Sequence, residues 1–244
     1  MKKFKTTFTT TFLMVLIFLS QGCSVNGVNT LSGDGNVQEK HYEIDEFNSL
    51  KLGGSLNIVL TEGDKPGLIV ETDENLHPHI NIESEDKVLN IYSNRDIVLR
   101  PTKLNIYITY TSLEKILTSG ASKITTETLI SSESFILEIS GACSGELHIE
   151  TENLKTDVSG AASIRLKGTA SLHNITLSGA SSLKAEELIT EKTVIRLSGA
   201  GSATIYASED LDATLSGVGS IKYAGDPKTK NTNVSGIGKI SSID

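Results

Sequence analysis

Aromatic residues and cysteines are scarce in this chain. Its 244 residues include no tryptophan, six phenylalanines, six tyrosines and two cysteines. A core with so few rings has to be built from aliphatic side chains. Cys23 follows an N-terminal apolar run, which leaves Cys143 without a partner in the rest of the sequence. Disulfide bonds are therefore not what holds this protein together.

Positive charge is also in short supply. The chain has 22 Lys and Arg against 30 Asp and Glu, a formal net charge of −8 at pH 7. Loss of an N-terminal leader that carries three lysines makes the remainder more negative by the same amount. Proteins that bind nucleic acid gain affinity from Lys and Arg contacts with phosphates. The composition therefore excludes nucleic acid as a partner, and the acidic surplus favours solubility.

The first 22 residues have the layout of a secretory signal peptide. Lys2, Lys3 and Lys5 precede an apolar run from Phe12 to Leu19, which is too short to span a bilayer as a mature helix. We therefore expect the segment 1–22 to be removed.

The end of this leader resembles the lipobox of bacterial lipoproteins. Gly22 precedes Cys23, although Ser20 stands where leucine is usual. We expect Cys23 to be lipidated and to become the new N-terminus, and several acyl chains would anchor it firmly to a membrane. Ser24 resembles the sorting signal that directs Gram-negative lipoproteins to the outer membrane. The alternative is ordinary secretion with Cys23 unmodified.

Residues 23–40 are polar, contain glycine and show no sustained period. They predict a flexible tether between the lipidated residue and a body at 41–244. The stretch SGDGN within them has one acidic residue, Asp34, which is too few for a calcium loop.

A short phrase, Ser-Gly followed by Ala, Val or Ile, recurs seven times in the second half of the chain. Successive copies lie 18 to 21 residues apart. Apolar and polar residues alternate on both sides of most copies, which is the pattern of a β-strand with one buried face. The glycines of the phrase are Gly120, Gly141, Gly160, Gly179, Gly199, Gly217 and Gly236.

A period near 19 residues with two or three short strands predicts an all-β fold, a single-stranded parallel β-helix, or solenoid. We expect its coils to be right-handed rather than left-handed. The alternative is an antiparallel meander, but the Asn-Gly or Asp-Gly turns that it needs are missing from the repeats. Residues 117–244 form the regular coils in this interpretation. Residues 41–116 form diverged, wider coils or hairpin excursions, with Gly53-Gly54-Ser55 in place of Ser-Gly-Ala.

The seven glycines are predicted to form the corners of the coils. Equivalent residues of successive coils lie about 4.8 Å apart, so a corner must fit against its own copy above and below. Glycine allows either a positive φ or a bend too crowded for a side chain. The neighbouring serines can bond to one another or to the backbone of the bend. Alternatively, they form a ladder that binds a glycan or an ice-like lattice.

Several stretches together resemble the head GIN domain family of auto-transporter adhesins, which occurs in exported bacterial lipoproteins. The resemblance covers the chain from about residue 42 onward and implies a β-helix-like fold and a place in the cell envelope. It implies no catalytic residues. The stretches are FNSLKLGGSLNIVLTEGD, VETDENL, NIYITYTSLEKILTSGASKI, LSGASSLK, LSGAGSAT and LSGVGSIK.

Residues suited to catalysis do not converge in the repeats. Glycoside hydrolysis needs two opposed carboxylates, yet the acidic residues occupy different places in their coils. His77-Pro78-His79 predicts a turn with exposed imidazoles rather than a metal site, because no cysteine or third histidine is near in sequence. Cys143 is expected to fill the interior. We therefore predict no catalytic residue, no metal and no cofactor.

One outward position of the repeats carries charges of both signs. Arg165, Lys184 and Lys222 all lie six residues after their serine, but Glu146 and Thr204 occupy the same place in other coils. This column predicts a mixed surface that discourages lateral association rather than a basic binding stripe.

The last phrase, NVSGIGKISSID, reaches an inward apolar position at Ile240 without a polar capping segment after it. A solenoid needs its ends covered, because an exposed coil presents unpaired backbone and an open core. We expect Val234, Ile237 and Ile240 to be covered by another copy, end to end, or by a strand from the N-terminal part.

These features predict a non-enzymatic lipoprotein of the cell envelope, structural or adhesin-like. Its ligand would be a glycan or a protein, bound at a broad outer face or at one end. The alternative is an enzyme or a lectin that acts on polysaccharide, which requires a cleft with convergent polar groups.

Overall fold

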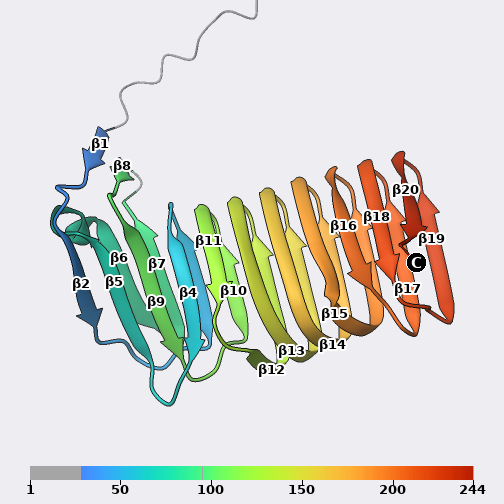
Figure 1. Cartoon of the computed structure of the whole chain (residues 1–244), viewed down its shortest axis with the longest axis horizontal. Helices are drawn as coiled ribbons and strands as arrows, with labels where there is room; N and C mark the ends of the chain where they lie inside the picture. Colours follow the sequence, from blue (N-terminus) through green and yellow to red (C-terminus); the bar gives the residue numbers. More distant parts are fainter. Residues whose placement is uncertain (1–28, 95, 244) are drawn as a thin grey trace, which may run out of the picture.

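The computed structural model describes residues 29–94 and 96–243, which form an elongated stack of coils (Figure 1). These residues contain twenty strands and one short 3-10 helix. The predicted signal peptide and Cys23 lie outside the described residues. In the part that is described, no helix is long and apolar enough to cross a membrane.

Each regular coil has one strand before its Ser-Gly corner and one after it. The strands before the corners make up one sheet wall, the first wall, which includes β10 (Lys115–Thr118), β17 (Asp210–Leu215) and β19 (Thr229–Val234). The strands after the corners make up the second wall, which includes β11 (Ala121–Thr126), β16 (Ala200–Tyr206), β18 (Val218–Ala224) and β20 (Ile237–Ser242). Three longer strands begin in the second wall and end in the first; they are β13 (Ala142–Val158), β14 (Ala161–Leu177) and β15 (Ala180–Leu197). β12 (Ile130–Ile139) follows β11 in its coil and ends in the first wall.

Every strand pairing between these coils is parallel, and the equivalent positions of successive coils are in register apart from one shift between β14 and β15. The strand pairs β13 with β14 and β14 with β15 each extend over both walls. The predicted parallel β-helix is therefore confirmed, and the antiparallel meander is wrong for this part of the chain. The long connection between parallel neighbours is the coil itself.

The Ser-Gly corners stack directly on one another, as predicted. Ala142, Ala161 and Ala180, each just after a corner, pair in register. A Cβ added to Gly160 would overlap the carbonyl oxygen of Gly141, and the same holds at each of the other corners. None of the seven corner glycines has a φ in the left-handed region. Glycine is thus required by the close approach of successive backbones and not by a positive φ.

Alternate residues of the two walls point into a continuous aliphatic core. One inward column contains Leu50, Ile116, Leu137, Ile175 and Ile195, all buried. Burial of each such side chain stabilises the fold by about 1.5–3 kcal/mol. The core therefore consists mainly of aliphatic side chains, with Phe47, Tyr110 and Phe135 among its few rings, as the shortage of aromatic residues predicts.

The unequal spacing of the repeats is absorbed inside the strands. Ser178 and Ser198 lie 20 residues apart. Lys184 pairs with Arg165 but Glu187 pairs with Lys167, so β15 carries one extra residue there as a β-bulge. The register recovers before the next corner.

The first coil is the diverged one, as predicted. Its strands are β3 (Ser49–Gly53) and β4 (Asn57–Glu62), which pair in parallel with β10 and β11. A Cβ on Gly120 would overlap the backbone of Gly54, so Gly53-Gly54-Ser55 forms the first corner of the stack.

Of the two alternatives for residues 41–116, wider coils or hairpin excursions, the structure shows the second, because antiparallel pairs occupy much of this region. β5 (Gly67–Asp73) runs antiparallel to both β9 (Leu104–Tyr110) and β2 (Val37–Tyr42). β6 (Ile80–Glu85) runs antiparallel to β7 (Val88–Ser93). Asp86 and Lys87 between them have positive φ values of 50° and 62°. Two such residues make the tight turn that reverses a chain within one sheet.

The expected tether is wrong for residues 29–40. β1 (Asn29–Ser32) pairs in parallel with β8 (Ile97–Arg100), and β2 joins the second wall. The buried Asp73 carboxylate holds the loop between β1 and β2, because it accepts the backbone N–H of Gly35 at 2.8 Å and that of Thr102 at 2.7 Å. A sequence without sustained alternation is thus ordered by a partner that lies about 40 residues away.

The two ends of the stack differ. The 3-10 helix η1 (Glu74–His79) lies at the N-terminal end beside β2, with Leu76 and His77 buried (Figure 1). At the other end, among the described residues, β19 pairs with β17 and β20 pairs with β18 only. The strands β1 and β2 lie far from this end, so the expectation that an N-terminal strand covers it is wrong.

Candidate functional site

A cleft of about 770 Å³ lies against the outer face of the first wall, at its N-terminal end. Its floor comes from β3, β6 and β7, and one side comes from β8. The polar side chains that line it include Lys51, Asn81, Asn90 and Tyr92. It combines amide, ammonium and phenol groups in a concave surface, which is the general character of a ligand site.

The alternation of the strands aims these side chains outward together. Asn90 of β7 pairs with Lys51 of β3 and with Glu83 of β6. Asn81 and Tyr92 pair in the same hairpin. Neighbours in register on one face lie within reach of each other, so polar side chains from three strands gather at one place.

Glu83 of β6 fixes two of these side chains, those of Asn90 and Tyr92. Its carboxylate accepts the Tyr92 hydroxyl at 2.6 Å and the Asn90 amide at 3.0 Å. These two hydrogen bonds, Tyr92 first, lower the pKa of the Glu83 carboxyl. The ring of Tyr92 and the amide of Asn90 are therefore held in fixed positions at neutral pH.

A second hollow, the edge groove, runs along the Ser-Gly corners with a volume of about 470 Å³. The corner serines donate their hydroxyls to backbone carbonyls of the preceding coil: Ser140 to Thr118 at 3.2 Å and Ser178 to Val158 at 3.3 Å. They form a ladder that ties coils together rather than bonding to one another. Lys51, Leu52 and Ser119 line both the edge groove and the cleft.

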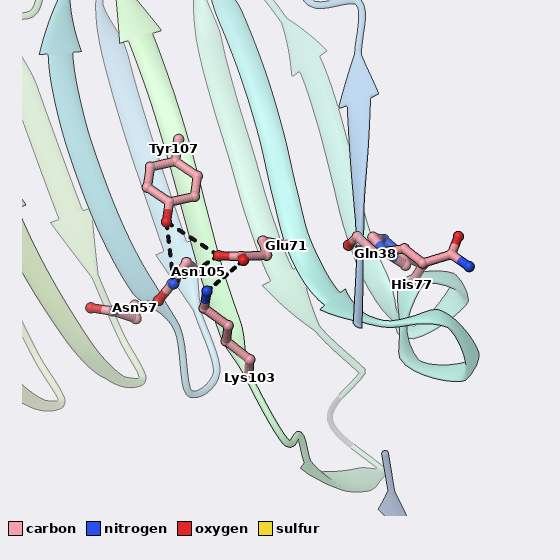
Figure 2. A network of polar contacts seen from close by, with 7 residues as sticks. All are labelled: Gln38, Asn57, Glu71, His77, Lys103, Asn105 and Tyr107. Atoms are coloured by element: carbon pink, nitrogen blue, oxygen red, sulfur yellow. Dashed lines mark hydrogen bonds and ion pairs between the residues drawn. The ribbon is translucent and has the colours of Figure 1, made fainter. Parts of the chain in front are cut away.

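The outer face of the second wall carries a polar network near the same end of the molecule (Figure 2). The Glu71 carboxylate accepts three hydrogen bonds: one from the Lys103 ammonium at 2.5 Å, one from the Asn105 amide at 3.0 Å and one from the Tyr107 hydroxyl at 3.2 Å. The hydrogen bond from Lys103, followed by that from Asn105, lowers the pKa of the Glu71 carboxyl. Asn57 extends the network to β4 by donating to Asn105 at 2.6 Å. It joins β4, β5 and β9 across the sheet.

The pair His77 and His79 is not the exposed turn that was predicted. His77 is 4% exposed, and its Nε2 lies 3.2 Å from the carbonyl oxygen of Gln38 on β2 (Figure 2). Burial lowers the pKa of its imidazole. His77 therefore satisfies a carbonyl at the edge of β2, where a further strand would otherwise pair. The periodicity of the sequence contained no signal for this contact.

His173 and Cys143 are interior residues. His173 is 1% exposed and its Nε2 lies 3.0 Å from the Thr156 hydroxyl, and burial lowers its pKa to about 3. Cys143 is buried, as predicted, and burial raises the pKa of its thiol to about 11. A thiol held in its protonated form is a poor nucleophile.

Two residues of the column of mixed charge, Arg165 and Glu146, take part in ion pairs. Arg165 lies 2.9 Å from Glu187 and 3.8 Å from Glu146, and Lys167 lies 2.8 Å from Glu146. Lys167 and Glu187 lie outside the column and join it to neighbouring positions of the surface. Around Arg165 the surface therefore carries charges of both signs.

A third hollow, of about 560 Å³, is lined by Glu133, Glu150, Glu152 and Glu191 with hydroxyl residues between them. No histidine, lysine or arginine lines it. Lyase and hydrolase chemistry would need a base or an opposed acid in defined positions. Among residues 29–94 and 96–243, no group of three or more His, Cys, Asp or Glu is placed to hold a metal ion.

The three residues predicted at the C-terminal end differ in exposure. Ile237 is 78% exposed and Val234 is 44% exposed, whereas Ile240 packs partly against the core. Lys230 covers part of the end, because its ammonium lies 5.5 Å from the centroid of the Tyr223 ring and donates to the Tyr223 hydroxyl at 3.1 Å. The last described coil is thus partly polar, which the sequence analysis missed.

The cleft was missed as well, although its residues have a visible pattern. Asn90 and Tyr92 alternate with buried residues in KVLNIYS, and Asn81 and Glu83 do the same in HINIE. Each stretch predicts a strand with a polar outer face. Which strands become neighbours depends on the hairpin, and periodicity does not contain that information.

Fold and surface together define a parallel β-solenoid with a polar cleft at one end. The chain belongs to the family described as "Putative auto-transporter adhesin, head GIN domain", whose model matches residues 46–227. No curated protein sequence matches it.

Solved structures from Bacteroides and Parabacteroides species share this fold. A putative adhesin from Bacteroides fragilis has 25% identity and a TM-score of 0.84, over 87% of this chain and all of that one. A putative lipid binding protein from Parabacteroides distasonis has 23% identity and a TM-score of 0.72, over 88% of this chain and all of that one. A putative adhesin from Parabacteroides merdae has 21% identity and a TM-score of 0.71, again over 88% of this chain and all of that one.

Proposed function

We propose that this protein is a non-enzymatic, adhesin-like binding module of the bacterial cell envelope, and that the cleft beside Tyr92 receives its glycan or protein ligand. The proposal is supported by membership of the adhesin family. The observation that carries it is the cleft itself, in which Lys51, Asn90 and Tyr92 converge on one hollow. Among the described residues, neither an acid–base pair nor an activated nucleophile lines this cleft.

Lipidation of Cys23 is part of the proposal. Cys23 lies six residues before Asn29, the first residue of β1. Six extended residues span at most about 21 Å. An acylated Cys23 would therefore hold the arm formed by β1 and β8, and the cleft beside it, close to the outer membrane. Replacement of Cys23 by serine should move the protein from the membrane fraction to the soluble fraction, and a variant that stays with the membrane would contradict the anchor.

The binding function is tested with a glycan array beside a reducing-sugar release assay. We expect binding without release of reducing ends. Tyr92→Ala and Lys51→Ala should weaken binding about tenfold or more, because each removes a group that lines the cleft. Lys184→Ala is the matched control, since Lys184 is an exposed lysine on the second wall.

Turnover of a polysaccharide would contradict the proposal and favour the alternative, an enzyme on the same scaffold. Binding that the cleft variants leave unchanged would place the site elsewhere. Capture of a purified envelope protein by the wild type, but not by Tyr92→Ala, would support the protein ligand.

A further inference from the structure

The cleft and the edge groove are parts of one depression. Lys51, Leu52 and Ser119 line both of them, at the junction of β3 and β10. From Asn81 on β6 to Thr176 on β14, the depression crosses β7, β3, β10, β12 and β13 in the order in which they pair. Six strand spacings of about 4.8 Å give a length of about 29 Å.

We infer that this depression is a single extended site for a linear, uncharged oligosaccharide that lies across the coils. The inference rests on the proposed binding function and specifies its ligand class. A depression of this length accommodates several sugar units in a row, whereas the cleft alone accommodates a chain end.

The lining matches a chain of hydroxyl groups. Near Tyr92, the amides of Asn81 and Asn90 offer both donors and acceptors. Along the edge, the hydroxyls of Ser140 and Ser178 donate to the coil beneath, which leaves their oxygen lone pairs to accept from a ligand. Sugar hydroxyls both donate and accept, so either half of the site can bond to them.

The acidic residues of the edge groove are fixed and neutralised. Glu138 lies 3.1 Å from Lys115, and Asp157 lies 2.7 Å from Lys155. Their carboxylates remain acceptors for hydroxyl groups, while their charge is balanced by the neighbouring lysines. An uncharged ligand suits such a groove better than a polyanion or a polycation does.

The edge groove offers a peptide no free strand edge to pair with. Peptides dock on β-structure mainly by adding a strand to a free edge. Each strand beneath the edge groove is paired on both sides, as Leu117 is with Lys51 and with Glu138. The groove is therefore suited to side-chain contacts with a polyol rather than to backbone pairing.

The test measures how the affinity of the protein for an oligosaccharide depends on the length of that oligosaccharide. The probes are glucose and N-acetylglucosamine oligomers with β-1,4 linkage, from disaccharides to octasaccharides. The affinity of each oligomer is measured by titration calorimetry. We expect affinity to rise with each added unit until the depression is filled. Tyr92→Ala should weaken every length, because it removes a ring that lines the cleft at one end of the depression.

A variant at the end of the depression away from Tyr92 distinguishes an extended site from a site confined to the cleft. Thr176→Arg fills the groove on β14 and should weaken the octasaccharide about tenfold while leaving the disaccharide unchanged. Asn174→Arg is the matched control, because Asn174 is exposed on the same face two residues earlier and does not line the groove.

The outcomes distinguish this inference from the proposed function. Affinity that stays flat beyond the trisaccharide, with Thr176→Arg silent at every length, would overturn the extended site and leave the cleft as the binding site. Binding of a protein in place of every oligomer would also overturn it without affecting the adhesin-like role. Loss of all ligands in both assays would overturn both.

Discussion

At the scale of single residues, the missing side chain of glycine and the buried side chain of histidine have the largest consequences. The recurrence of Ser-Gly was sufficient to predict the corners, because a stacked bend demands the same small residue in every coil. The sequence alone could not decide between a positive φ and a crowded backbone. It also contained no signal that His173 faces the core, since an isolated histidine fits an inward or an outward position equally well.

Replacement of Gly160 by alanine should destabilise the solenoid. Its new Cβ would overlap the carbonyl oxygen of Gly141 in the coil before, so the two backbones must separate. We expect a loss of about 2 kcal/mol or more in the free energy of unfolding, measured by urea denaturation. Ser159→Ala is the control and removes a 3.4 Å hydrogen bond from an exposed hydroxyl. Equal stability of the two variants would argue against crowding at the corner.

His173 should make stability depend on pH below neutrality. The unfolded chain binds a proton at this residue near pH 6.5, whereas the folded chain does so only near its lowered pKa of about 3. The contribution of neutral His173 to the free energy of unfolding is therefore fully present above pH 6.5 and is lost as the pH falls from there toward 3. The loss is about 1.4 kcal/mol per pH unit, or roughly 2 kcal/mol between pH 6.5 and pH 5.

Urea midpoints at pH 7.5 and pH 5 measure this effect. His173→Leu should reduce the difference between the two midpoints, because Leu154 occupies the same inward position in the coil before. His148→Gln should leave it unchanged, since His148 is exposed. A His173→Leu variant with the acid sensitivity of the wild type would show that other groups are responsible.

At the scale of elements, alternation predicted strands well and their neighbours poorly. The stretches GLIVETD, HINIE, KVLNIYS and KLNIYITYT all form strands, as period-two patterning indicates. The antiparallel pairing of β6 with β7 follows from the local turn at Asp86 and Lys87. The antiparallel pairing of β5 with β9 joins segments about 30 residues apart, and no local turn sets it. β1 and β2 were missed because a buried carboxylate at the end of β5, that of Asp73, holds the loop between them. A hydrogen bond between residues far apart in the chain produces no periodic pattern in the sequence.

Asp73→Asn should loosen the N-terminal arm without unfolding the coils. The carboxylate accepts N–H groups of Gly35 and Thr102 with its two oxygens, and an amide can accept with only one. We expect faster amide exchange in residues 29–36 and 97–102 and unchanged exchange in β13–β15. Asp34→Asn is the control, because Asp34 bonds within its own exposed turn. Unchanged protection of the arm in Asp73→Asn would contradict this role.

The arm should also respond to acid. Burial raises the pKa of Asp73, but hydrogen bonds from Thr102 and Gly35 outweigh it, and the pKa lies below the usual value for aspartate. The contribution of this carboxylate is therefore present at neutral pH and disappears as the pH falls through its lowered pKa. Amide exchange in residues 29–36 should rise in strong acid before that of the regular coils.

At the scale of the whole molecule, the asymmetry of the two ends matters most. η1 and His77 protect the edge at the N-terminal end, whereas β19 and β20 leave an edge free in the described chain. Exposed strand edges promote association unless they are blunted by charge or cover. Lys230 over Tyr223 supplies part of that cover, and Val234 and Ile237 remain exposed.

Association of two copies through this end stays a prediction. Sedimentation velocity should show a dimer at high concentration, and Val234→Lys with Ile237→Lys should abolish it by placing like charges at the contact. Val98→Lys with Ile189→Lys is the matched control, because both residues are exposed and apolar but lie elsewhere. A monomer at every concentration, with residues 232–240 still protected from amide exchange, would rule out this contact.

The exact stacking of the glycine corners makes the single coil a unit of evolutionary change. Because each corner meets an identical corner, duplication or loss of one coil of about 19 residues between two corners restores the same contacts on both sides. The molecule can thus lengthen or shorten in steps of about 4.8 Å while its two ends stay the same. The length of the edge groove would therefore change with the copy number of one short stretch of gene.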